Sequence, residues 1–488
     1  MKKDLNKEVE ENSDPEIEIL FNGENVLDFW TYDEKGNPKL LQGKLMKFLG
    51  RNGFVNITQN NRNIGLVQEL NNRIKKSTVE MAVQLVKEHL ERKALDDIYE
   101  VFAKGVGSYL SRMKLNLLKS IEIINDRDQR NSSRFYFHNC FIDISDEDFQ
   151  IKPYKELDTV IWENRIINKE FVFPSNNSRG QFETFCFNIC KKDEERFLAF
   201  KTMLGYLLHR NTERGEDVAV ILYDENMGGS RAEGGTGKTL LSTALNHCRD
   251  RVEIGGKQLK MGSNFAYQRV DYTTDIIVFE DFAKSVSLEP FFDMITGGME
   301  VEKKMKQAFY ISRKMMPKIM FTSNYLIKGP KGSSTRRRKY EFELANYYND
   351  WFRPEHEFKN RFFDDLWSKD EWNKFFYFMM TCIQDYLEKG LVKAAPINFN
   401  KVRMADKSSD EFIDFMDENL EYNKWIDKRF YQELFEDMYP DIEKVSSKMF
   451  GIWLNDYAHK YGGEYETKST GSKYYFIVRI KKVNDEEK

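Results

Sequence analysis

The stretch that decides the fold is DVAVILYDE (Asp217–Glu225), followed after five residues by the glycine-rich sequence RAEGGTGKTL (Arg231–Leu240). The apolar run predicts a buried strand, and the residues after Lys238 predict that a helix begins there. Backbone N–H groups in such a turn approach phosphate oxygens closely, and the N-terminus of the following helix favours negative charge. The stretch therefore predicts a phosphate-binding loop at the end of a strand in an α/β domain.

The residue types in this loop match the parts of a nucleotide-binding motif. Lys238 would reach the β- and γ-phosphates of ATP, and the Thr239 hydroxyl would bind Mg²⁺. The full motif has a glycine where this chain has Ala232, so an ordinary glycine-rich loop that binds nothing stays an alternative. The residues that we expect around the nucleotide are Gly234, Gly235, Thr236, Gly237, Lys238 and Thr239.

Two later strands end in polar side chains of the kinds that an ATPase uses. The sequence TTDIIVFED predicts a buried strand over Ile276–Phe279 that ends in Glu280 and Asp281. One carboxylate would help to hold Mg²⁺, for which we favour Glu280, and the other would orient or deprotonate the attacking water. A third strand, KIMF (Lys318–Phe321), leads to Asn324, whose amide could sense the γ-phosphate. At a strand end, acids are often only solvated and an asparagine is often only a turn residue.

A basic segment follows the acidic pair. From Lys303 to Lys339 the chain has 12 lysines and arginines and no acidic residue, although its net charge is −4. A solvated surface normally mixes charges of both signs. The segment therefore predicts a polyanionic partner whose binding depends on salt.

The order of these motifs resembles superfamily 3 helicases, which are AAA+ type motor ATPases of viruses, phages and plasmids. The sequence GGMEVEKKMKQ (Gly297–Gln307) resembles a hairpin motif of that superfamily. In the family, one hairpin lysine touches DNA in the pore of a ring and a second, two residues on, reaches the nucleotide. The resemblance assigns these roles to Lys304 and Lys306, while Met305 replaces the histidine that some members have.

The resemblance also implies a hexameric ring in which an arginine of one subunit reaches the ATP of its neighbour. Arg336, Arg337 and Arg338 stand where the family has this arginine finger, and the choice among them stays open. The implied catalytic set is Lys238, Glu280, Asp281, Lys306, Asn324, Arg336, Arg337 and Arg338. The implied DNA contacts of the hairpin are Lys303, Lys304 and Met305.

The flanking sequence predicts further domains around this α/β core of AAA+ type. We expect an acidic leader over 1–19, a mostly helical accessory domain over 20–130 in which Ser77 and Glu80 form a capping box, and an α+β region over 131–210. The core would span 211–345 and a helical extension 346–400. The regions before the core resemble the accessory domains of phage, plasmid and poxvirus-type primase-helicases.

The final segment, 401–488, predicts a winged-helix domain. Its helical pattern VSSKMFGIWLNDYA precedes a hairpin with its turn near Ser469–Ser472. Lys448 would lie on the recognition helix and Lys468 and Lys473 beside the wing, where they would bind duplex DNA. A docking domain that binds no DNA is the alternative.

Composition limits the class of protein. No apolar stretch is long enough for a membrane span, and the N-terminal sequence lacks the apolar core of a signal peptide. The cysteines fit buried thiols in a reducing cytoplasm, and their spacing gives no structural metal site. The abundant Lys, Asn, Phe and Tyr indicate an AT-rich genome, so we expect a protein in the cytoplasm of a bacterial host.

The sequence thus predicts an ATP- and Mg²⁺-dependent replicative helicase of a mobile element, acting on single-stranded and forked DNA with a separate primase or polymerase. A bifunctional primase-helicase is an alternative, although residues 1–190 show no convincing pair of catalytic carboxylates on a strand. Another is an ATP-switched initiator or defence protein that assembles on DNA without unwinding it.

Overall fold

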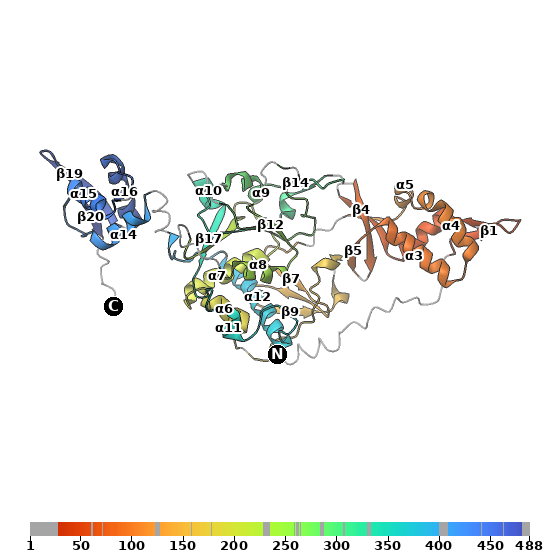
Figure 1. Ribbon diagram of the computed structural model, residues 1–488. Coiled ribbons are helices and arrows are strands. Elements are labelled where there is room, and N and C mark those ends of the chain that lie inside the picture. Colours follow the sequence, from red (N-terminus) through yellow and green to blue (C-terminus); the bar gives the residue numbers. More distant parts are fainter. Residues whose placement is uncertain are drawn as a thin grey trace.

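The computed structural model describes the following residues: 28–59, 62–70, 72–122, 127–157, 159–176, 178–227, 235–257, 259, 263, 265–283, 287–305, 308–328, 333–399, 408–440, 442–461 and 463–480. The expected acidic leader lies outside them. Figure 1 shows the central α/β part of the chain between an N-terminal lobe and a C-terminal lobe. In the described ranges, no helix is long and apolar enough to cross a membrane.

The central part is built on a sheet whose described strands all run parallel. The order across the sheet is β12-β13-β16-β11-β17, which confirms the expected parallel α/β sheet. The strands are β11 (Ala219–Asp224), β12 (Arg251–Gly255), β13 (Ile276–Glu280), β16 (Lys318–Ser323) and β17 (Lys339–Leu344).

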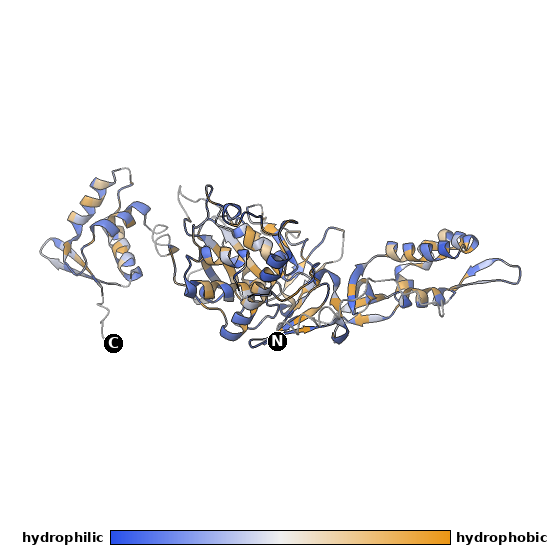
Figure 2. Cartoon of the chain, turned by 90° about the horizontal axis from the view of Figure 1, so that it is seen from below, coloured by the Kyte–Doolittle hydropathy of each residue, from blue (hydrophilic) through white to orange (hydrophobic). Residues whose placement is uncertain are grey.

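Alternation along these strands builds a core on each face of the sheet. In β11, Val220 and Leu222 pack with Leu241 of helix α8 (Lys238–Asn246), whereas Ile221 and Tyr223 belong to the core on the other face. Both faces of a parallel sheet are normally covered in this way, which explains why the strands read as continuous apolar runs. Figure 2 shows the apolar segments gathered inside this part of the molecule.

Long helices cover the α8 side of the sheet. Helix α7 (Glu194–Leu208) begins at Asp193, whose side chain accepts a hydrogen bond from the Arg196 amide, and it packs along α12 (Lys369–Lys389). A Cβ at Gly205 would lie 2.1 Å from the Cys382 carbonyl oxygen, so only glycine permits this close approach. The cysteines are buried free thiols, as the sequence predicts.

The region expected over 131–210 contains an antiparallel sheet in the order β7-β8-β9, followed by helices. Its elements are β7 (Ser133–Tyr136), β8 (Phe141–Ile144), β9 (Phe149–Lys152), η1 (Tyr154–Glu156), β10 (Ile161–Trp162), η2 (Glu163–Arg165) and α6 (Gln181–Asn188).

The N-terminal lobe differs from the mostly helical domain that the sequence predicts, because it also contains a sheet in the order β10-β5-β4-β3-β6. Its elements are β1 (Trp30–Tyr32), β2 (Pro38–Leu40), α2 (Gln42–Arg51), β3 (Phe54–Gln59), β4 (Arg62–Leu70), β5 (Arg73–Ser77), α3 (Val79–Arg92), α4 (Asp96–Tyr109), α5 (Arg112–Leu115) and β6 (Ser120–Glu122). The expected capping box is also wrong in detail. Thr78 caps α3 and accepts a hydrogen bond from the Met81 amide, because Ser77 is still the last residue of β5.

The remaining elements connect or follow the central sheet. Between β13 and β17 lie η4 (Glu289–Phe291), α9 (Phe292–Thr296), β14 (Met299–Val301), β15 (Phe309–Ile311), η5 (Arg313–Met315) and α10 (Ser333–Arg337). Strands β14 and β15 pair antiparallel, as the hairpin prediction requires. Helix α11 (Pro354–Phe358) precedes α12.

The C-terminal lobe has its own core of buried side chains. It runs in the order α14 (Asp410–Asn419), β18 (Ile426–Asp427), α15 (Lys428–Met438), α16 (Ser447–Lys460), β19 (Gly463–Thr470) and β20 (Lys473–Ile480). Ser446 caps α16 and accepts a hydrogen bond from the Met449 amide. The hairpin turn falls between Thr470 and Lys473, as the sequence predicts.

Candidate nucleotide-binding site

The carboxyl ends of three adjacent strands bring the candidate polar residues to one edge of the sheet. Tyr223 of β11 is paired with Ser323 of β16, and Phe279 of β13 is paired with Phe321. The next residues along each strand therefore leave the sheet at the same edge. These residues include Asp224, Glu280 and Asn324.

Lys238, the first residue of α8, connects two of these strand ends. Its ammonium donates to the Asn324 side-chain oxygen at 2.6 Å and to the Asp224 carboxylate. The Thr236 hydroxyl donates to the other oxygen of Asp224. A buried ammonium requires such partners, since an unpaired charge in a protein interior is costly. The structure thus brings Lys238, Thr236 and Asn324 together.

Sequence reasoning missed the role of Asp224. The residue is 1% exposed although it carries a charge, and it holds both Thr236 and Lys238. The available signal was its position, because a carboxylate ends the apolar strand just before the glycine-rich loop.

The described part of the loop adopts backbone angles that favour glycine. Gly235 and Gly237 have φ values of 103° and 108°, which lie in the left-handed region. A Cβ on Gly237 would also lie 2.5 Å from Cζ of Phe185 in α6. The neighbouring helix therefore fixes the loop from outside, which the sequence did not indicate. Gly234 and Ala232 lie outside the described residues.

The two acids after β13 lie in different surroundings. Glu280 is half-buried, and its pKa is raised by burial and, to a smaller extent, by the nearby Glu253, while Arg251 opposes this shift. Arg251 donates to the Ser242 hydroxyl of α8 and to Glu253. Asp281 instead pairs with Lys257 at 3.1 Å, is more exposed, and has a φ of 51°, in the left-handed region that aspartate adopts more readily than most non-glycine residues.

The residue types at this edge fit a hard cation. Mg²⁺ prefers oxygen ligands and keeps several of its waters. Glu280 offers a carboxylate, and Thr239, in the first turn of α8, offers an exposed hydroxyl. These residues would hold the ion, and the ion would supply charge stabilisation to bound phosphates.

The arginines lie at the opposite edge of the sheet. They precede β17, which runs parallel to β11, so they stand at the amino end of the strands. At about 3.3 Å per residue, β17 separates the two edges by roughly 17 Å. Arg336 and Arg337 are exposed, and the Arg338 guanidinium lies over the Phe292 ring at 5.0 Å.

The hairpin presents some of its predicted DNA contacts to solvent. Lys304 is exposed, and Met305 is 97% exposed with a φ of 58°. Lys303 is partly buried because its ammonium binds Asp271 at 2.9 Å, and Asp271 also binds Lys76 of β5. Lys306 lies outside the described residues.

In the C-terminal lobe the predicted DNA contacts are exposed. Lys448 lies in the first turn of α16, and Lys473 begins β20. Lys468 of β19 places its ammonium 4.1 Å from the centre of the Trp425 ring. Lys468 and Lys473 lie close to the same hairpin turn.

No protein-family model matches the chain, and no curated protein matches it. Among solved structures, the chain is similar to the apo A form of the NrS-1 C-terminal region (CTR), at 13% identity and a TM-score of 0.40, over 89% of this chain and 99% of that one. It is also similar to a ligand-bound JCV helicase, at 12% identity and a TM-score of 0.25, over 57% of this chain and 64% of that one. Similarities this distant support no assignment of function.

Proposed function

We propose that the chain is an ATP-dependent DNA helicase of superfamily 3 type. The observation that carries the proposal is the position of Lys238 between Asp224 and Asn324, with Glu280 at the end of an adjacent strand. A cation at a helix N-terminus, beside a strand-end acid and amide, is the arrangement that binds and hydrolyses a nucleoside triphosphate.

In the proposed reaction, Lys238 leaves Asp224 and binds the β- and γ-phosphates, while Thr239 and Glu280 hold Mg²⁺. Asn324 contacts the γ-phosphate or the attacking water. Asp281, the second acid at the end of β13, would orient or deprotonate that water, and Lys306 is assigned to the reaction by the resemblance alone.

The arginine finger must act between subunits in this proposal. Arg336, Arg337 and Arg338 lie roughly 17 Å from the carboxyl edge of their own sheet, so they serve the ATP of a neighbouring subunit. Transition-state stabilisation by such an arginine accelerates hydrolysis by about 10³-fold or more. This requirement favours a closed homo-oligomer, for which we propose a hexamer.

The DNA contacts would lie on the hairpin and in the C-terminal lobe. Lys304 and Met305 at the exposed hairpin tip would contact single-stranded DNA in the pore, with Lys303 beside them. The order of elements from α14 to β20 supports a winged helix whose Lys448, Lys468 and Lys473 bind duplex DNA. A separate primase or polymerase would act with the helicase in a bacterial host.

Strand displacement on a forked substrate tests the proposal. We expect the wild-type chain to hydrolyse ATP faster when single-stranded DNA is added and to displace the strand, and Lys238→Ala to do neither. Hydrolysis without displacement would favour an ATP-switched initiator or defence protein. Primer synthesis on a single-stranded template would favour a primase-helicase.

Mixing of inactive subunits tests the arginine assignment. We expect Lys238→Ala and Arg337→Ala chains to be inactive alone but to regain part of the ATPase activity when mixed. At some subunit boundaries of a mixed oligomer, an intact Lys238 then faces an intact Arg337 of the neighbouring subunit. The matched control mixes Arg337→Ala with the Lys238→Ala/Arg337→Ala double variant, which should restore nothing. Repeating the mixture with Arg336→Ala and with Arg338→Ala identifies which arginine is the finger. A chain that stays monomeric in the presence of an ATP analogue and DNA would contradict the proposed oligomer.

A further inference from the structure

A cavity of about 380 Å³ lies where the region before the core meets the amino end of the central sheet. It is bordered by the segment around η2, by the end of α7, by the C-terminal end of α8 and by the starts of β12 and β13. Its charged lining consists of Arg165, Lys169, Arg210, Arg249, Asp250 and Asp275. None of these residues belongs to the candidate nucleotide site.

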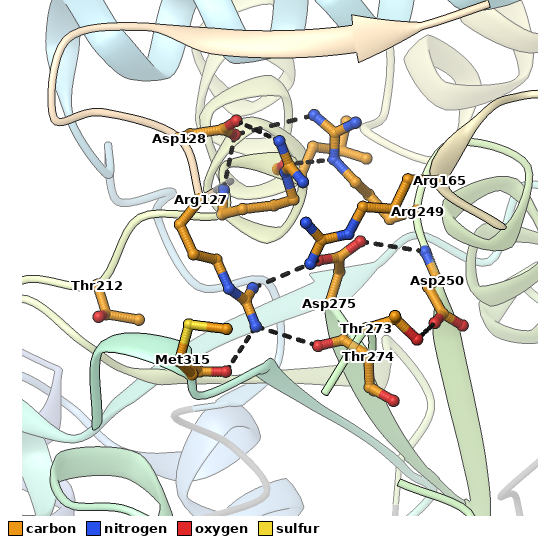
Figure 3. Close-up of polar contacts among 12 residues, drawn as sticks. Arg127, Asp128, Arg165, Thr212, Arg249, Asp250, Thr273, Thr274, Asp275 and Met315 are labelled. Atoms are coloured by element: carbon orange, nitrogen blue, oxygen red, sulfur yellow. Dashed lines mark hydrogen bonds and ion pairs between the residues drawn. The ribbon is translucent and has the colours of Figure 1, made fainter. Parts of the chain in front are cut away.

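The buried charges around this cavity are predominantly positive. Among the described residues that line it, four side chains are cationic and two are carboxylates. The carboxylates are also shared, since Asp275 binds both Arg127 and Arg165 at 3.3 Å. Figure 3 shows this cluster, in which Asp128 faces the neighbouring arginines.

A third carboxylate, Asp128, does not line the cavity and is also shared between two arginines. Asp128 binds Arg210 at 2.8 Å and lies 4.0 Å from Arg249. Burial lowers the pKa of Arg165 to about 10 and also lowers that of Arg249, whereas Asp128 and Asp275 raise the pKa of Arg210. A buried cation is stable only when its charge is compensated, so the cluster favours an additional anion.

The rim has groups suited to a phosphate compound. The Lys169 ammonium lies 4.0 Å from the centre of the Trp372 ring, and Asn168 is exposed beside it. His247, at the end of α8, adds no positive charge near pH 7, because burial and the nearby Lys169 lower its pKa to about 4. A guanidinium group can donate two parallel hydrogen bonds to two oxygens of one phosphate, a geometry that an ammonium group lacks.

We propose that this cavity binds a small anion with a polyphosphate group, as in inorganic pyrophosphate or a nucleoside triphosphate. Its volume is within the usual range for small-molecule sites, and arginines from separate elements converge on it. The site is distinct from the phosphate loop, since Lys238 and the cavity lie at opposite ends of α8, about 13 Å apart along the helix axis. The proposal does not rest on the helicase activity.

Calorimetric titration of pyrophosphate into the full-length Lys238→Ala chain tests the proposal, because the phosphate loop is then disabled. We expect saturable binding with one site per chain. Lys169→Glu in this background should weaken it at least tenfold, since the substitution reverses a charge at the rim. The matched control is Lys155→Glu, which changes an exposed lysine of the same region outside the cavity lining and should leave the affinity unchanged.

A second variant and two further titrations make the result decisive. Asn168→Asp adds a negative charge at an exposed position of the rim and should also weaken pyrophosphate binding. This variant keeps the test valid if Lys169→Glu disturbs folding. ATP should compete with pyrophosphate in the Lys238→Ala chain, whereas adenosine should not. The proposal is overturned if Lys238→Ala binds no pyrophosphate, if both rim variants bind it like the control, or if adenosine competes as well as ATP.

Discussion

The pairing of Asp224 with Lys238 predicts a loss of stability that nucleotide restores. Asp224 is 1% exposed, and the Lys238 side chain is 10% exposed. In Asp224→Asn the ammonium keeps Asn324 but loses its carboxylate partner. Removing one member of a buried ion pair costs about 3–5 kcal/mol, and the lower end applies because the asparagine amide still offers an oxygen.

A loss of roughly 3 kcal/mol corresponds to a fall in melting temperature of about 6–12 °C for a domain of about 150–250 residues. A nonhydrolysable ATP analogue with Mg²⁺ supplies a new counter-charge to Lys238. A ligand that binds only the folded state stabilises it, and the stabilisation grows with the logarithm of its affinity. We therefore expect the analogue to raise the melting temperature of Asp224→Asn more than that of the wild type and to close at least half of the gap.

Differential scanning calorimetry of both chains, with and without the analogue, measures this gap. Glu343→Gln is the matched control. Glu343 of β17 is an equally buried acid beside Tyr223, and its carboxylate accepts a hydrogen bond from the Asn398 backbone amide at 2.7 Å instead of from Lys238. Its loss of stability should persist with nucleotide. If the analogue shifts Asp224→Asn and the wild type equally, Lys238 does not transfer from Asp224 to phosphate, and the proposed binding step is wrong.

Three other predictions concern the same core. Glu280→Gln should lower kcat for ATP hydrolysis by at least 10²-fold while nucleotide still binds, because a neutral amide is a poorer Mg²⁺ ligand than a carboxylate. An equal loss in Glu253→Gln, a nearby acid that binds Arg251, would contradict this role of Glu280. Gly237→Ala should reduce the affinity for a fluorescent ATP analogue at least tenfold, because an alanine in the left-handed conformation costs about 1–2 kcal/mol and its Cβ would clash with Phe185. Phe185→Leu in the same chain should restore part of the lost affinity. Burial lowers the pKa of Lys318 to about 8. Between pH 8 and about 10.4 the unfolded chain therefore binds one proton more than the folded chain, and the free energy of unfolding rises with pH. In denaturant titrations Lys318→Met should reduce this rise by about 2–3 kcal/mol, and an unchanged rise would contradict the lowered pKa of Lys318.

Much of the core follows from local sequence. The apolar runs before Asp224, Glu280 and Asn324 predict strands because both faces of a parallel sheet are buried, and the glycines before Lys238 predict the turn. Parallel strands have their carboxyl ends at one edge, so the convergence of these polar ends could also be anticipated. The turn of the final hairpin is similarly local.

Only the tertiary structure reveals which distant residues share a charge. Asp224 binds Lys238, and Phe185 of a separate helix packs against Gly237. Asp275 binds arginines that lie more than a hundred residues away in the sequence. Such contacts depend on how whole elements pack, because no local pattern records a partner across the fold. The sequence by itself determined the chemistry at the strand ends, and packing decided which ions are paired, which are exposed and where buried positive charge accumulates.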